Sequence, residues 1–208
     1  MRRLYLFMGF IFLLINYING QTPISAGIKI GFNSSKMITE IANVNEIEDA
    51  SKNGLLAGVF VRINLSKFYL QPEAYFAKKS GDFQYTNSSN AIFTQQNDFN
   101  TIDIPFLIGL KLIDLKVVNL RIMAGPMASL IIGKDIKYQL NGIETSFSGS
   151  PTENFKNTNW GIQAGMGIDV LNFTLDVKYE WGINNISDYN DMTTKSKIIN
   201  VSLGMKFF

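Results

Sequence analysis

The chain has 208 residues, of which 46% are hydrophobic and 17% are charged, and it contains no cysteine and no histidine. The absence of both residue types excludes disulfides, thiol catalysis, Cys/His metal sites and histidine-based catalytic triads. The formal net charge of +2 gives no reason to expect a nucleic-acid partner. No cofactor is expected either.

Residues 1–20 have the features of a secretory signal peptide. Arg2 and Arg3 form a positive start, residues 4–15 are apolar but too short to span a membrane, and residues 16–20 are a short polar exit. Cleavage is expected before Gln21, although Ile18 stands where a small residue is usual. We therefore expect a signal peptide at 1–20 and one β-barrel domain at 21–208, with zero net charge after cleavage.

The rest of the chain alternates apolar and polar residues in eight runs. In chain order these runs cover 26–33, 55–64, 68–79, 102–112, 118–130, 160–170, 173–184 and 199–207. A period of two is typical of β-strands, because successive side chains point to opposite faces. Each run is close to the roughly 9–11 residues that a tilted strand needs to cross a bilayer. No charged residue lies on the apolar side of any run, so the runs are predicted to be membrane-spanning strands.

The connections between these runs alternate in length. Long connections occupy 34–54, 80–100, 134–159 and 185–197, whereas the others have only a few residues. Bacterial outer-membrane barrels have short periplasmic turns and longer external loops. The pattern therefore predicts four long outer loops, with both ends of the domain on the periplasmic side.

Glycines and aromatic residues indicate that the apolar faces point outward, toward lipid. Glycines such as Gly27, Gly58 and Gly133 gather on the polar face by parity, and a strand glycine often marks a close approach, which the narrow lumen of eight strands requires. Aromatic residues at both ends of the apolar faces predict two interfacial girdles. Their outer members are Phe32, Phe76, Trp160 and Trp181, and their periplasmic members are Phe68, Phe173 and Phe207. The predicted fold class is all-β, an eight-stranded antiparallel up-and-down transmembrane β-barrel.

The charged residues of the runs all fall on the polar face, which the barrel would turn inward. They are Lys29, Arg62, Glu73, Lys79, Asp103, Lys111, Arg121, Asp169, Asp176, Lys178, Glu180 and Lys206. Charges removed from water must be paired, so a structural ion-pair network filling the lumen is expected. Two alternatives stay open: a proton or ion path, and acid–base chemistry by a carboxylate pair such as Asp176 and Glu180. No calcium-loop spacing is present, and no metal is expected.

The outer loops are the other candidate site. Phe83, Tyr85, Phe93, Phe99 and Tyr189 fall in the second and fourth loops. Exposed aromatic residues can anchor a protein or ligand partner, although these could equally pack on the barrel rim. Membrane lipid is the other expected partner, and a monomer is expected.

Five motifs in order resemble the PorT-like outer-membrane β-barrel proteins of Bacteroidetes. They are GIKIGFN at 27–33, LQPEAY at 70–75, IDIP at 102–105, AGP at 124–126 and KYEWGINNI at 178–186. Lys178 stands where that family usually has arginine. The resemblance implies an outer-membrane barrel, and the name-giving member of the family is linked to protein secretion.

The function expected from the sequence is a structural or interaction role through the outer loops. The protein is expected in the outer membrane of a Gram-negative bacterium, after export through a cleaved signal peptide, and is not expected to be an enzyme. Alternatives are an accessory component of protein secretion or transport, a membrane-embedded enzyme using carboxylates, and a soluble periplasmic lipocalin-like binding barrel.

Overall fold

The computed structural model describes residues 24–41, 48–86, 92–115, 117–140, 143–144, 157–184 and 192–207. Its strands are β1 (Ile24–Ile41), β2 (Glu48–Leu65), β3 (Phe68–Thr86), β4 (Ile92–Asp114), β5 (Val118–Leu140), β6 (Ile143–Glu144), β7 (Thr158–Val170), β8 (Phe173–Gly182) and β9 (Met192–Lys206). The predicted signal peptide at 1–20 and Tyr189 lie outside the described residues. Within the described ranges there is no helix of the length and apolar character needed to cross a membrane.

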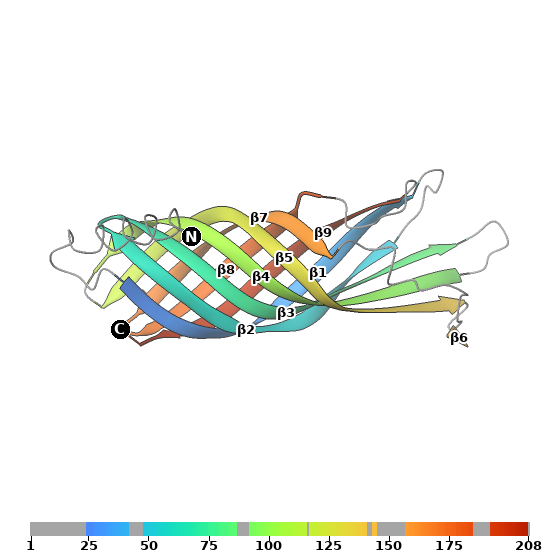
Figure 1. Ribbon diagram of the computed structural model, residues 1–208, viewed down its shortest axis with the longest axis horizontal. Helices are drawn as coiled ribbons and strands as arrows, with labels where there is room; N and C mark the ends of the chain where they lie inside the picture. The colour runs from blue at the N-terminus through green and yellow to red at the C-terminus, as the bar shows by residue number, and fades with distance from the viewer. Residues whose placement is uncertain are drawn as a thin grey trace, which may run out of the picture.

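Eight long strands close into an antiparallel barrel, which confirms the predicted fold class (Figure 1). Each strand pairs with its neighbour along the chain, and β1 closes the ring by pairing with β9. The two-residue β6 only forms a short hairpin with the end of β5. Closure matters in lipid, because a closed barrel pairs its backbone groups without leaving an open edge.

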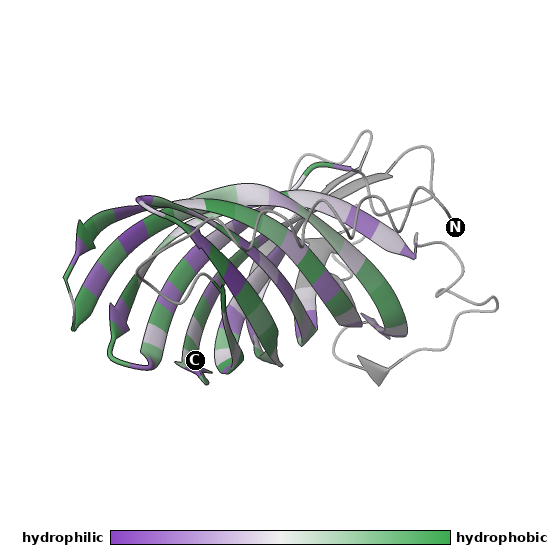
Figure 2. Ribbon diagram, turned by 60° about the vertical axis from the view of Figure 1, so that its left-hand side comes forward, coloured by the Kyte–Doolittle hydropathy of each residue, from purple (hydrophilic) through white to green (hydrophobic). Residues whose placement is uncertain are grey.

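The barrel wall is apolar outside and polar inside. Along β8, the side chains of Leu175 and Val177 are exposed, whereas those of Asp176 and Lys178 are each only 2% exposed. Figure 2 shows the same alternation as bands of opposite hydropathy along the strands. Soluble monomers rarely expose apolar surface on this scale. The outward apolar face therefore excludes the lipocalin-like alternative, in which the apolar face would point inward.

The aromatic residues predicted to form two girdles all point outward. They are Phe32, Phe68, Phe76, Trp160, Phe173, Trp181 and Phe207, each more than a third exposed. Phe68 and Phe173 directly follow the two-residue turns, and Phe207 follows β9 at the same end. Their contact with the membrane interfaces stays a prediction.

The strands continue well beyond the apolar runs. β4 and β5 each have 23 residues, or about 75 Å at roughly 3.3 Å per residue, against an apolar membrane core of about 30 Å. Parts of the sequence expected to form all four outer loops are therefore paired strand. Outside lipid, both faces of a strand can be polar, so the end of the alternation marks the edge of the membrane and not the end of the strand.

Because the strands are longer than expected, the aromatic residues predicted to lie in the second outer loop lie in strands. Phe83 and Tyr85 lie in β3 and Phe93 lies in β4, in register with neighbouring strands and not in a loop. Phe99 also lies in β4 and is only 2% exposed. The prediction that Phe83, Tyr85, Phe93 and Phe99 are loop residues is therefore wrong, because β3 and β4 continue beyond the apolar runs.

A β-bulge reverses the face of the outer part of β5. Thr101 of β4 pairs with Ile131, but Asn100 pairs with Gly133, which leaves Ile132 as the extra residue. Gly133 therefore shares the face of the exposed Asn100. The sequence parity assigned Gly133 to the lumen, and that assignment is wrong because one extra residue shifts the side chains that follow to the opposite faces.

Two of the short turns have only two residues. Leu65 pairs with Phe68, and Val170 pairs with Phe173. The first residue of each turn has a positive φ, 61° at Ser66 and 54° at Leu171. A positive φ at this position matches the twist of the two strands that it joins.

Candidate functional site

The lumen side chains form a continuous set of polar contacts, here called the ionic ladder, in three clusters. The inner cluster, nearest the short turns, centres on Asp169. Arg62 donates to the Asp169 carboxylate at 2.5 Å and Arg121 donates to it at 3.1 Å. Arg121 also forms an ion pair with Asp176. Lys206 lies 3.5 Å from Asp169, so two carboxylates face three cations.

Aromatic and glycine residues shape this inner cluster. The guanidinium groups of Arg62 and Arg121 lie over the ring of Tyr69, at 5.2 and 5.8 Å from its centroid. A Cβ on Gly109 would lie 2.0 Å from the Tyr69 ring, and one on Gly167 would lie 2.7 Å from the Arg121 guanidinium. These glycines therefore provide the space that the large side chains occupy.

The middle cluster is built around Glu73. Lys29 and Lys178 donate to the same carboxylate oxygen of Glu73, at 2.7 and 2.6 Å. Gln71 donates to the other oxygen at 2.7 Å, and its own carbonyl oxygen accepts from Arg62 at 2.7 Å. A neutral amide thus joins the middle cluster to the inner one.

Tyr75 and Gln163 join the middle cluster to the outer one. The ammonium groups of Lys29 and Lys178 lie 5.4 and 5.5 Å from the centroid of the Tyr75 ring. The Gln163 amide donates to the Tyr75 hydroxyl at 2.6 Å and to Glu180 at 3.2 Å. The ladder therefore continues through a cation–π contact and a side-chain amide.

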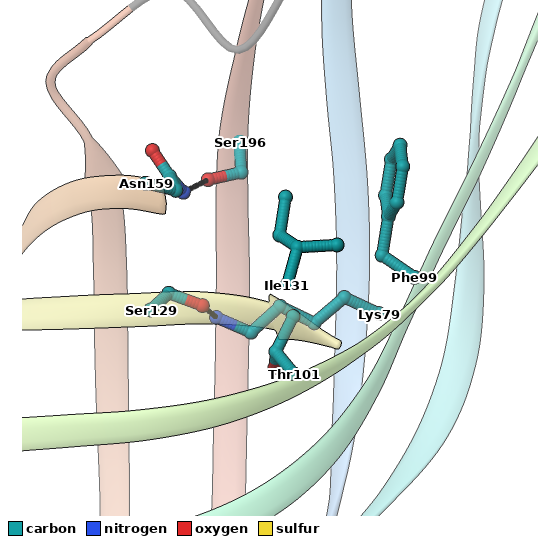
Figure 3. A pocket seen from close by; sticks show the side chains of 7 residues that line it. All are labelled: Lys79, Phe99, Thr101, Ser129, Ile131, Asn159 and Ser196. Atoms are coloured by element: carbon teal, nitrogen blue, oxygen red, sulfur yellow. Dashed lines mark hydrogen bonds between the residues drawn. The ribbon is translucent and has the colours of Figure 1, made fainter. Parts of the chain in front are cut away.

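The outer cluster has one cation and two carboxylates. The Lys79 ammonium lies 2.7 Å from Glu180 and 2.8 Å from Asp103. Ser129 donates to Asp103, and Lys79 lies 3.4 Å from the Ser129 hydroxyl (Figure 3). These side chains come from four different strands, so the cluster reaches across the lumen from β3, β4 and β5 to β8.

A small cavity above the outer cluster marks the barrel mouth (Figure 3). It is lined by Lys79, Phe99, Thr101, Ser129, Ile131, Asn159 and Ser196. Its volume is about 10 Å³, which is room for about one water molecule. Asn159 donates to Ser196 across it at 3.1 Å. Where the structure describes the mouth, these side chains therefore leave little more room than one water molecule needs.

The structure places the predicted lumen charges in this ladder with one exception. Lys111 lies at the inner mouth, where its ammonium is 3.4 Å from the more exposed carboxylate of Asp114. The uncharged connectors Gln71 and Gln163 were not singled out from the sequence. Their parity and polarity place them in the lumen, but their partners depend on strand register, which the sequence pattern does not give.

The carboxylates of the ladder are paired with cations and are not paired with each other. Asp176 pairs with Arg121 in the inner cluster, whereas Glu180 pairs with Lys79 in the outer one. These two carboxylates are four residues apart on β8, which is about 13 Å, so they do not form the acid–base pair considered from the sequence. In the described part of the chain, no group of three acidic residues is arranged to hold a metal ion.

A closed barrel with an apolar outer belt and an ionic interior is the architecture of small outer-membrane β-barrel proteins. Residues 19–188 match the family model described as outer membrane protein beta-barrel domain. The chain belongs to this family, and the protein is an outer-membrane barrel whose short turns face the periplasm.

Similar solved structures have low sequence identity to the chain. Ail of Yersinia pestis, in complex with the heparin analogue sucrose octasulfate, is 15% identical over 88% of this chain and 99% of that one, with a TM-score of 0.41. Neisserial surface protein A is 14% identical over 88% and 97% of the two chains, with a TM-score of 0.46. OprG of Pseudomonas aeruginosa is 12% identical over 88% and 94%, also with a TM-score of 0.46. No curated protein matches the chain.

Proposed function

We propose that the protein is a non-conducting outer-membrane barrel that presents a β-sheet above the membrane as a binding surface. The observation that carries this proposal is the outer edge of β5, with which no strand among the described residues pairs between Ile132 and Tyr138. The ionic ladder supports it, because side chains fill the lumen where a channel would have to run. The working surface is then expected outside the barrel.

The barrel wall separates into two parts at its outer end. Pairing between β1 and β2 ends at Ser35 and Lys52, and pairing between β5 and β7 ends at Leu130 and Thr158. The sheet of β2 to β5 continues past this level, and β1 and β9 continue together as a separate antiparallel pair (Figure 1). The outer sheet therefore has a strand edge that the barrel below does not have.

The edge of β5 is open between Ile132 and Tyr138. Among the described residues, β4 pairs with this segment on one side and no strand pairs with it on the other. An open edge can accept an extended polypeptide as an added strand. Lys134, Asp135 and Lys137 give the segment a net positive charge, which favours a partner strand with acidic residues. The proposed partner is an extended acidic polypeptide segment.

Binding of the purified mature barrel, held in lipid nanodiscs, to an array of immobilised peptides tests this proposal. Acidic peptides with strong β-propensity should retain the barrel, and copies carrying central prolines should not, because proline removes ladder donors. Lys137→Glu should weaken retention. Lys67→Glu, in a periplasmic turn, is the matched control and should not. Equal retention of the proline-containing copies would contradict strand addition.

We also propose a narrower family for the chain. The five motifs support a PorT-like protein of Bacteroidetes, exported as a monomer after removal of residues 1–20. An accessory role in protein secretion or transport is the second candidate function. Secretion components encoded by neighbouring genes would favour it, and intact-mass measurement of the mature protein would test cleavage before Gln21.

A further inference from the structure

Two lysines face each other on the outer surface of the barrel. Lys36 of β1 and Lys197 of β9 are directly opposed in the strand register. On β9, the buried Ser196 and Ile198 flank the exposed Lys197. On β1, the buried Asn33 and Ser35 set the same alternation, which turns Lys36 outward. Both ammonium groups therefore lie on the lipid-facing side of the wall.

This pair is unfavourable without an anion. Like charges directly opposite each other on neighbouring strands are destabilising. None of the ion pairs among the described residues involves Lys36 or Lys197. Lys78, another outward lysine beyond the apolar belt, differs because it lies 2.9 Å from Asp98. The pair thus lacks the internal partner that Lys78 has.

The register places the pair at the level of the outer membrane interface. Lys197 is directly opposed to Trp181 on β8, and tryptophan is enriched at the headgroup level. Lys197 is also the first outward residue beyond the apolar Ile199. On the other side, Ser34 and Asn53 are opposed on β1 and β2, one outward position below Lys36. They add polar side chains beside the two ammonium groups.

We propose that Lys36 and Lys197 bind the phosphate group of an outer-leaflet lipid. A phosphate between the two ammonium groups would cancel their repulsion and accept charge-assisted hydrogen bonds. Trp181 and Ile199 would contact the apolar part of the same molecule. The site would hold one lipid against the seam between β1 and β9, and it does not depend on the partner proposed for the β5 edge.

A thermal unfolding experiment tests the site in a phosphate-free sugar detergent. The probes are phosphatidic acid, a diacylglycerol with the same acyl chains, and inorganic phosphate. Phosphatidic acid should raise the unfolding midpoint of the wild-type barrel, whereas the other two should not. The K36Q/K197Q double variant should lose this shift, and Lys78→Gln should keep it because Lys78 is already paired with Asp98.

The unfolding midpoints of the variants without lipid are a second, independent test of the site. In phosphate-free detergent, Lys197→Gln should unfold at the same or a higher midpoint than the wild type, because it relieves repulsion. With phosphatidic acid, the wild type should unfold at a higher midpoint than Lys197→Gln. An unchanged lipid response in the double variant would overturn the proposal. An equal shift with inorganic phosphate would overturn the assignment to lipid.

Discussion

At the scale of single residues, the interior depends on charges that have no access to bulk water. Glu73 is the clearest case, because one carboxylate holds both Lys29 and Lys178. Removing one partner of a buried ion pair leaves an uncompensated charge, which costs far more than removing a surface pair. The stability of the barrel should therefore respond strongly to changes at the middle cluster.

Glu73→Gln should lower the free energy of unfolding by about 3–5 kcal/mol, the usual cost of breaking a buried pair. Guanidinium unfolding of the refolded barrel in detergent measures this. The matched control is Asp114→Asn, which removes an exposed carboxylate 3.4 Å from Lys111 and should change stability by less than about 1 kcal/mol. Equal losses of stability in both variants would contradict the claim that the buried ion pairs of the ladder stabilise the barrel more than an exposed pair does.

Lumen glycines are the second feature at this scale. Gly109→Ala would place a methyl group 2.0 Å from the Tyr69 ring, and overpacking of this kind typically costs about 1–3 kcal/mol. Gly133→Ala is the control, because its nearest contact is the Asn100 amide at 3.1 Å on the outer face. Heat-modifiable gel migration and unfolding midpoints compare the two. A tolerated Gly109→Ala would mean that the lumen is less filled than described.

At the scale of elements, each strand must keep an uncharged face toward lipid. Ile108 is 55% exposed on β4. Ile108→Arg should destabilise the inserted barrel by about 2–4 kcal/mol if this position lies near the bilayer midplane. Asn100→Arg, on the same face but beyond the apolar run, should be nearly neutral. Folding titrations into lipid vesicles measure the stability of both variants. A larger loss of stability in Asn100→Arg than in Ile108→Arg would mean that the membrane-spanning part of β4 is wrongly placed.

The two-residue turns give a prediction of opposite sign. Leu171 has a φ of 54°, a conformation that costs a non-glycine residue about 1–2 kcal/mol. Leu171→Gly should therefore raise the free energy of unfolding, by up to about 1 kcal/mol after the entropy cost of glycine. Asn172→Gly lacks that benefit and should lower it. Chemical unfolding of both variants decides, and a loss of stability in Leu171→Gly would contradict the strain argument.

The faces of the strands could be predicted from the sequence, but their lengths and partners could not. Alternation assigned Arg62, Glu73 and Lys178 to the lumen, because parity within one strand is a local property. The bulge at Ile132 and the extension of β3 to Thr86 depend on pairing with a neighbouring strand. The Gln71 bridge between Arg62 and Glu73 depends on packing between distant segments, which no local pattern contains.

At the scale of the whole molecule, the barrel is a closed wall around a filled interior that carries a sheet above the membrane. An eight-stranded barrel is just wide enough for side chains to fill, and here the ionic ladder runs from Asp169 near the periplasmic turns to Lys79 near the mouth. The outer sheet is therefore the proposed surface for a binding partner. This division between anchor and binding surface is the central claim.

Planar-bilayer recording of the purified mature protein tests this claim most directly. The account predicts a silent bilayer for the wild type, because the large buried side chains of the ladder fill the lumen that the structure describes. A variant that replaces Arg121 and Tyr69 by alanine serves as the positive control, since it removes two of the largest lumen side chains. Stable, reproducible conductance steps from the wild-type barrel would contradict the account and make a channel the leading function.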